Sequence, residues 1–133
     1  MKPGMGRRKG HDFERAIANL LKPLFPDARR GLDQPQGGGR QPDVDGTPFW
    51  IETKCGWRTN IKAAVEQAWV ASTGTDRPVV AITKDDHETA LATMRLGDWI
   101  SLIEELQSLR GQAQYLAAAS DELVGLAKRE AAP

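Results

Sequence analysis

The sequence predicts an α/β domain in which a mixed β-sheet is flanked by helices and followed by extra C-terminal helices. Two amphipathic helical patterns alternate with two pairs of short apolar runs, in the order α, β, β, α, β, β, which is typical of a sheet covered by helices. The length of 133 residues suits one compact domain. We therefore expect a single domain over residues 1–133, with a basic N-terminal arm at 1–11 and a helical extension at 97–130.

The composition is that of an ordinary globular protein, with 40% hydrophobic and 27% charged residues. These values exclude disordered and collagen-like classes. No apolar run approaches the roughly 18 residues of a membrane span, and the basic N-terminus is not followed by the apolar stretch of a secretion signal. One cysteine and two histidines cannot form an intramolecular disulfide or a multi-cysteine zinc site. We therefore expect an intracellular, cytoplasmic protein without membrane contact.

The first helix is predicted over residues 12–25, where apolar side chains recur at helical spacing and share one face. These side chains are Phe13, Ile17, Leu20, Leu21 and Leu24. Pro23 and Pro26 end the pattern. Residues 31–42 contain four glycines and two prolines without periodicity, so they predict an exposed loop.

A β-hairpin is predicted next, because short runs at 42–44 and 49–54 flank an Asp-Gly-Thr-Pro turn at 45–48. A turn centred on its glycine and threonine pairs Val44 with Phe49, and this pair faces the core. Asp43 then pairs with Trp50, on the opposite face of the sheet.

The second half begins with a helix predicted over 59–73, with Thr59 or Asn60 as its N-cap. Residues 78–83 form a continuous apolar run, as expected for a strand buried on both faces. Residues 89–94 predict a neighbouring strand.

The C-terminal extension has helical spacing that is interrupted at Gly111, which predicts two successive stretches. Leu116 and Leu123 are seven residues apart in the second stretch. This spacing fits a helix packed on its own domain or a seam between two chains, and the sequence leaves both open.

The net charge of zero conceals an uneven distribution. Residues 1–30 carry eight Lys or Arg against three acids, a charge of +5, whereas residues 31–58 carry −1 and residues 59–133 carry −4. A basic first quarter can hold a polyanion on one face of a protein that is neutral overall. A basic N-terminus that is merely solvated is the alternative.

Charged side chains converge on one face of the predicted hairpin. Because side chains alternate along a strand, Glu52 and Lys54 share a face with Trp50, and the hairpin register adds Asp43, diagonal to Glu52. Two neighbouring carboxylates require a counter-charge, so a cation is expected between them. Glu14, beside the apolar stripe of the first helix, is expected to point at the same patch. Solvated ends of an amphipathic hairpin are the alternative.

The sequence resembles the PD-(D/E)xK nuclease superfamily. Pro-Asp at 42–43 and Glu-Thr-Lys at 52–54 match its motif, and Lys-Gly-His-Asp-Phe-Glu-Arg at 9–15 is similar to the opening of the archaeal-type Holliday-junction resolvases and their phage relatives. The resemblance covers residues 6 to about 94. It implies a restriction-endonuclease-like fold and a metal-dependent endonuclease that resolves four-way DNA junctions; a phage-encoded protein acting in its host cell is compatible with it.

The resemblance also implies a role for individual residues. The metal ligands would be Glu14, Asp43, Glu52 and the Thr53 carbonyl. Lys54 would orient or stabilise the attacking water, and Gln67 would lie beside the site, unless it is a solvent-facing helix residue. The implied cofactor is Mg²⁺, with Mn²⁺ as a substitute, which suits an all-oxygen ligand set. No small-molecule cofactor is expected.

The expected partners are branched DNA and a second copy of the chain, since a resolvase makes two symmetric cuts. Candidate DNA contacts are Arg7, Arg8, Lys9, His11, Arg15, Arg30 and Arg40. Candidate dimer surfaces are Trp69, the 89–94 strand and the Leu116/Leu123 stripe. A related nuclease of nicking or restriction type, or a non-catalytic DNA-binding module of the same fold, is the alternative.

Overall fold

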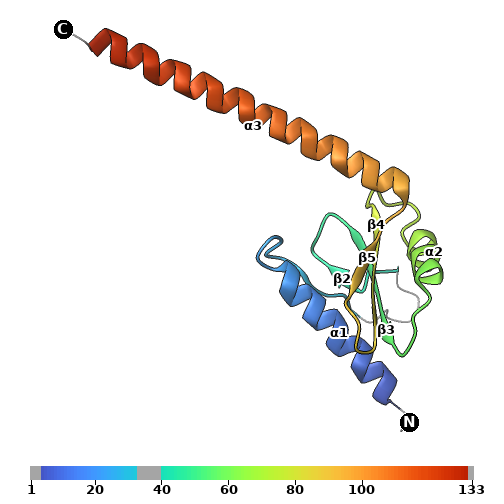
Figure 1. The fold of residues 1–133 in the computed structure, drawn as a ribbon. Helices are drawn as coiled ribbons and strands as arrows, with labels where there is room; N and C mark the ends of the chain where they lie inside the picture. Colours follow the sequence, from blue (N-terminus) through green and yellow to red (C-terminus); the bar gives the residue numbers. More distant parts are fainter. Residues whose placement is uncertain (1–3, 33–39, 132–133) are drawn as a thin grey trace. The chain divides into compact units, whose positions relative to one another are not determined.

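The computed structural model describes residues 4–32 and 40–131. The chain divides into two compact units, Met1–Arg95 and Leu96–Pro133. The first unit holds the sheet and two helices, and the second is a single long helix (Figure 1). Within the described residues, no helix is both long and apolar enough to cross a bilayer.

The first unit is an α/β fold built on a five-stranded mixed sheet, as predicted. The strands lie in the order β1-β2-β3-β4-β5, and only the β3–β4 pair is parallel. Their bounds are β1 Arg29–Arg30, β2 Val44–Asp45, β3 Trp50–Gly56, β4 Val79–Asp85 and β5 Leu91–Thr93. The connection from β3 to β4 runs through α2, Ile61–Ala71, as a parallel pair requires.

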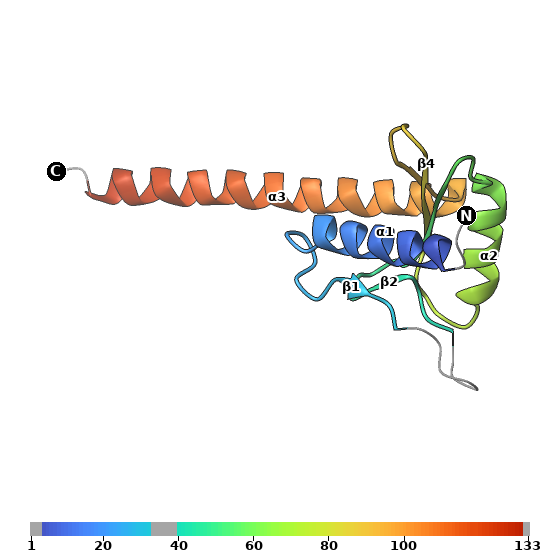
Figure 2. The ribbon, with the colours of Figure 1, turned by 90° about the horizontal axis from the view of Figure 1, so that it is seen from below.

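Helices cover both faces of the sheet (Figures 1 and 2). Ile17 of α1, Met5–Leu21, packs with Ile51 of β3 in one core cluster, while Ala68 of α2 packs with Trp50 in another. Since Trp50 and Ile51 are consecutive strand residues, the two helices lie on opposite faces.

Helix α1 begins earlier than the sequence predicts. The basic arm expected at 1–11 is wrong from Met5 onward, because residues 5–11 form the first two turns of α1. These turns are exposed, and their arginines and lysine are good helix formers that need no buried face. At the other end the helix stops at Leu21 rather than at residue 25. The N–H of Lys22 still donates to the carbonyl of Ala18, but Pro23 has no backbone N–H to continue the ladder.

The hairpin register differs from the prediction by two residues. Val44 pairs with Ile51, not with Phe49, and the N–H of Asp43 donates to the carbonyl of Ile51 at 2.9 Å. The loop is longer because the Thr47 hydroxyl accepts a hydrogen bond from the N–H of Phe49, which keeps that residue out of the ladder. A shift of two leaves every side chain on its predicted face.

Strand β1 was not predicted. Arg29 pairs with Asp45 and Arg30 with Val44, so two residues extend the sheet beyond β2. A strand of two residues has no periodicity that a sequence pattern could show.

The second half of the unit follows the prediction. Asn60 is the N-cap of α2, and its side chain accepts a hydrogen bond from the N–H of Ala63 at 3.0 Å. Strand β4 contributes Val79 to the α2 cluster and Ile82 to the α1 cluster, so it is covered on both faces. Strand β5 lies at the edge of the sheet.

The C-terminal unit is one continuous helix, α3, Leu96–Ala131. The predicted interruption at Gly111 is wrong. An interior glycine costs a helix only about 1 kcal/mol relative to alanine, so it weakens the helix without ending it.

Gly46 is required where the β2–β3 loop approaches the segment before β1. Its φ is +81°, and a Cβ added there would lie 2.0 Å from the carbonyl oxygen of Asp27. Gly74 has a similar φ of +88°, but a Cβ there would meet nothing within 4 Å. A side chain at Gly74 would therefore add backbone strain alone, whereas one at Gly46 would add strain and a steric clash.

We predict that Gly46→Ala lowers the free energy of unfolding by ~3 kcal/mol, because left-handed strain and overpacking both act. Gly74→Ala, the control, meets only the strain and should lose ~1 kcal/mol. Urea denaturation of both variants measures the difference. Equal losses would show that the approach to Asp27 costs nothing.

Candidate active site

A pocket of about 360 Å³ contains the predicted catalytic residues of α1, α2 and β3, together with the residue that precedes β2. Its lining comprises Arg7, Gly10, His11, Phe13, Glu14, Asp43, Glu52, Thr53, Lys54, Cys55 and Gln67. Helix α2 contributes Gln67 alone to this lining, and α1 contributes the basic and acidic side chains of one helical face. Residues separated by up to 60 positions, Arg7 and Gln67, therefore meet around one cavity.

Asp43 is held where the β2 ladder ends. Its backbone N–H donates to the carbonyl of Ile51, and its Oδ2 accepts from the backbone N–H of Thr53 at 2.8 Å. The Thr53 hydroxyl adds a longer contact of 3.4 Å to the same oxygen. The carboxylate thus takes the position of the acceptor that a continuing β2 strand would supply, and this locates it beside β3.

Glu52 is buried next to this carboxylate. Burial and the negative charge of Asp43 raise the pKa of Glu52 to about 7, and Lys54 opposes the rise. The Lys54 Nζ lies 3.5 Å from Glu52 Oε1. The predicted shared face of Glu52 and Lys54 is confirmed, and the two carboxylates form a close, partly desolvated pair.

Glu14 reaches the same pocket from α1 and is ion-paired to Arg30. Arg30 Nε donates to Glu14 Oε2 at 2.9 Å, and both side chains are largely buried. Burial and the charge of Asp43 raise the pKa of Glu14, while the Arg30 hydrogen bond lowers it. Sequence reasoning missed this pair, because Arg30 was grouped with the DNA contacts and no local pattern links residues 14 and 30.

Basic side chains of α1 continue from the pocket. Arg7 and His11 line both the site and an adjoining pocket of about 390 Å³, which Arg8 and Arg15 also line. Their positions, 7, 8, 11 and 15, follow helical spacing and so share one side of α1. Arg15 also pairs with Asp12 at 3.0 Å.

Two further candidate DNA contacts, Lys9 and Arg40, lie outside this side of α1. Lys9 Nζ contacts Asp86 Oδ1 at 2.6 Å, and this hydrogen bond raises the pKa of Lys9. Arg40 is exposed. It follows residues 33–39, which make up most of the predicted 31–42 loop and lie outside the described residues.

The donor chemistry of the site fits a hard divalent cation. Among residues 4–32 and 40–131, no three His, Cys, Asp or Glu side chains gather as a metal-binding group. Asp43 and Glu52 form a pair, and Glu14 is turned to Arg30. Mg²⁺ usually binds one or two carboxylates and keeps several waters, so the Asp43–Glu52 pair suffices as its protein ligands. A cation there would also relieve the repulsion that raises the pKa of Glu52.

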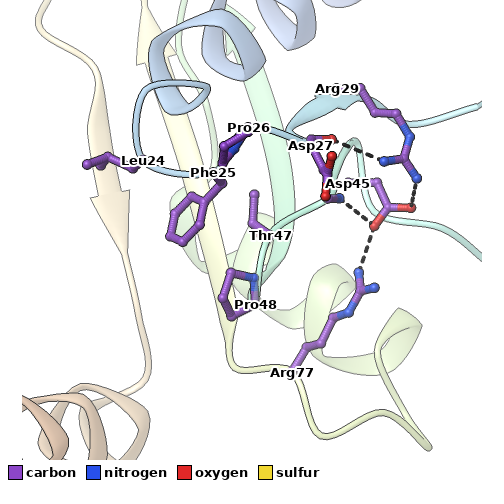
Figure 3. Close-up of a pocket in the computed structure, with 10 residues that line it drawn as sticks. Leu24, Phe25, Pro26, Asp27, Arg29, Asp45, Thr47, Pro48 and Arg77 are labelled. Carbon is purple, nitrogen blue, oxygen red and sulfur yellow. Dashed lines mark hydrogen bonds and ion pairs between the residues drawn. The ribbon is translucent and has the colours of Figure 1, made fainter.

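A larger pocket of about 530 Å³ lies between the α1–β1 and β2–β3 loops (Figure 3). Asp45 dominates its polar wall: Arg77 approaches one carboxylate oxygen at 2.9 Å and Arg29 the other at 3.4 Å. Burial raises the pKa of Asp45, but the hydrogen bond from Gly46 and the two guanidiniums together lower it below its ordinary value. This cluster ties β1 and β2 to the segment before β4, so its role is structural.

No protein-family model, no curated protein and no solved structure matches this chain. The assignment of a function therefore depends on the chemistry of the site pocket.

We predict that burial of Glu52 makes the metal-free protein less stable as the pH rises. Glu52 keeps its proton to about pH 7 when folded, whereas its ordinary pKa is 4.5. Between these values the folded state binds more protons than the unfolded state, so the free energy of unfolding falls with pH. Urea denaturation in EDTA at pH 5 and pH 7.5 measures this fall, which Glu52→Gln should reduce.

Glu66→Gln, at an exposed position of α2, is the matched control and should retain the wild-type slope. An identical pH dependence in Glu52→Gln and wild type would show that Glu52 ionises normally in the folded protein.

Proposed function

We propose that this protein is a Mg²⁺-dependent, structure-specific DNA endonuclease that resolves four-way junctions by phosphodiester hydrolysis. The observation that supports it most is the convergence of Asp43, Glu52 and Lys54 in one pocket beside the basic side of α1. A carboxylate pair whose burial raises the pKa of Glu52, with an adjacent ammonium, suits metal-assisted hydrolysis. The proposal includes the restriction-endonuclease-like type of the α/β fold.

Asp43 and Glu52 would hold the cation. When bound, the cation lowers the pKa of a water and neutralises charge that develops on the scissile phosphate, and Mn²⁺ can replace Mg²⁺ in both tasks. The hydrogen bonds from Thr53 orient Asp43 and keep its Oδ2 beside β3. The carbonyl of Thr53 is proposed as a further oxygen ligand.

Lys54 would stabilise the nucleophile. Its ammonium lies between Glu52 and solvent, where it can hold a deprotonated water or a phosphate oxygen by charge. Gln67, an uncharged side chain from α2, can orient water or phosphate by hydrogen bonds without altering the charge of the site. Glu14 would act through its neighbours: it fixes Arg30 and adds negative charge near Asp43.

The basic side of α1 would bind the DNA backbone. Arg7 and His11 connect the site to the adjoining pocket, so a strand that enters the site passes Arg8 and Arg15. Arg40 is proposed as an additional phosphate contact. Lys9, with its ammonium on Asp86, and Arg30, with its guanidinium on Glu14, contribute charge to the same region.

Two symmetric cuts require two sites, and each chain supplies one pocket of this kind. The proposed activity therefore includes a homodimer. Its substrate lies in the cytoplasm, either of the organism or of a host in which a phage-encoded copy acts.

We predict that Asp43→Asn and Glu52→Gln each lower the rate of junction cleavage at least ~10²-fold, because each removes one proposed cation ligand. DNA binding in EDTA should change little. A cleavage assay with a four-way junction and a linear duplex, each with and without Mg²⁺, measures both specificity and metal dependence. Glu66→Gln should cut as the wild type does.

The same assay separates the alternatives. Metal-dependent cutting of linear duplex in preference to the junction would indicate a nicking or restriction-type nuclease. Junction binding without any cleavage in Mg²⁺ or Mn²⁺ would indicate a non-catalytic DNA-binding module and would overturn the proposal.

We predict that Arg7→Ala with Arg8→Ala weakens binding to all DNA sequences. Each lost phosphate contact should flatten the plot of log affinity against log salt by ~0.9. Fluorescence anisotropy between 50 and 200 mM salt covers the range in which this effect is large. Lys22→Ala, at the opposite end of α1, should leave the slope unchanged; an unchanged slope in the double variant would show that these arginines are only solvated.

A further inference from the structure

Helix α3 carries a leucine at every seventh residue. The four leucines are Leu102, Leu109, Leu116 and Leu123. If they take position d of a heptad, position a holds Trp99, Leu106, Ala113, Ser120 and Ala127. Leucine at d in four successive heptads, with Trp99, Leu106 and then small residues at a, is the pattern of a coiled-coil seam. The sequence-level spacing of Leu116 and Leu123 is one step of this longer repeat.

The seam is exposed within one chain. The exposed fractions of the four leucines are 36%, 55%, 65% and 68% in chain order, and no described residue of α3 is buried. A helix of 36 residues in water owes most of its stability to packing of an apolar face. The interior glycines, Gly111 and Gly125, weaken α3 further, and both lie at position f, opposite the seam. This distribution is expected for a helix whose a/d face is covered by a partner.

The charged residues that flank the seam favour a second copy of the same helix. In a parallel, in-register pair, position g of one helix faces position e of the next heptad on the other. Glu105 at g then faces Arg110 at e, and the two-fold axis repeats this attraction. No other g–e contact in this register brings together two charges. An antiparallel pair with the same a/d layers would place Glu105 opposite Leu126 and Arg110 opposite Ala117.

We propose that α3 pairs with α3 of a second copy as a parallel, two-stranded coiled coil. Leucine at d is the choice of two-stranded coiled coils, and the small a residues from Ala113 onward let the helices approach closely. In this register Ser120 faces Ser120 of the second copy. A slipped alignment would place this hydroxyl opposite an apolar residue, so the serine favours the in-register pair.

The parallel sense has a consequence for the proposed function, on which this step rests. Each first unit is joined through Arg95 to the first residue of α3. Parallel helices therefore start both first units from the same end of the coiled coil. Antiparallel helices would start them at opposite ends, about 54 Å apart at 1.5 Å per residue. Two cuts close together in one junction therefore favour the parallel arrangement.

The other apolar candidates for a dimer surface offer less. The Arg95 guanidinium lies 3.8 Å over the ring of Trp69, so that ring already has a partner within the chain. Strand β5 has three residues, which is short for an edge that must hold two subunits together.

Sedimentation equilibrium of the full chain tests the pairing. The wild type should have a mass of about 29 kDa, twice the 14.6 kDa of one chain. Leu109→Glu with Leu116→Glu should halve that mass at micromolar concentration. Gln107→Glu with Gln114→Glu, at position b of the same two heptads, adds the same charge outside the seam and should remain dimeric.

Cross-linking tests the orientation. In a Cys55→Ser background, Leu102→Cys should form a disulfide with its own copy under mild oxidation, because only parallel, in-register helices bring the two positions together. Glu105→Arg should weaken dimerisation at least ~3-fold, and adding Arg110→Glu should restore it. A Leu102→Cys dimer that does not cross-link, or a charge exchange that fails to restore pairing, would overturn the parallel register.

The pairing and the nuclease proposal fail separately. A monomeric wild type, or a dimer that survives the double leucine substitution, would overturn the coiled coil whatever its cleavage activity. A dimer that the leucine substitutions dissociate, but that never cuts DNA in Mg²⁺, would overturn the nuclease and leave the coiled coil in place.

Discussion

The arrangement of the site depends on one hydrogen bond, from the backbone N–H of Thr53 to the carboxylate of Asp43. Strand β2 ends where β3 continues, so the next amide of β3 would lose its partner on that side. An unsatisfied amide in a partly buried position costs ~1–3 kcal/mol, and the Asp43 side chain prevents this loss. The same contact brings a negative charge next to Glu52, so sheet termination and site assembly have one cause.

The electrostatics of the pocket follow from this placement. Two carboxylates close together in a partly desolvated site cannot both ionise freely, and the protein assigns the proton to Glu52, the more buried. Burial and the charge of Asp43 raise the pKa of Glu14 as well, and the ion pair with Arg30 opposes this rise. The Lys54 ammonium opposes the rise in the pKa of Glu52 but leaves it at about 7. A divalent cation between the two carboxylates would relieve their repulsion, and this is the physical basis of the proposed activity.

The two units of the chain satisfy the requirement for burial in different ways. The first unit covers its sheet with α1 and α2 and closes a core of its own. Helix α3 carries four leucines at seven-residue spacing, yet no described residue of this helix is buried. Its glycines are tolerated because they lie away from the seam. The leucine repeat thus marks the face of α3 on which we propose that a second helix packs.

Local patterns indicated that each helix exists, offered Asn60 as one of two caps and determined the shared face of Glu52 and Lys54, because these depend on contacts a few residues apart. They did not determine the two ends of α1 or the continuity of α3 through Gly111. The face of Asp43 also survived a hairpin register wrong by two, since alternation repeats with that period. Tertiary structure decided the rest. The ladder partner of Val44, the strand at residues 29–30 and the ion pair between Glu14 and Arg30 all join segments that only the folded chain brings together, and no spacing in the sequence encodes such contacts.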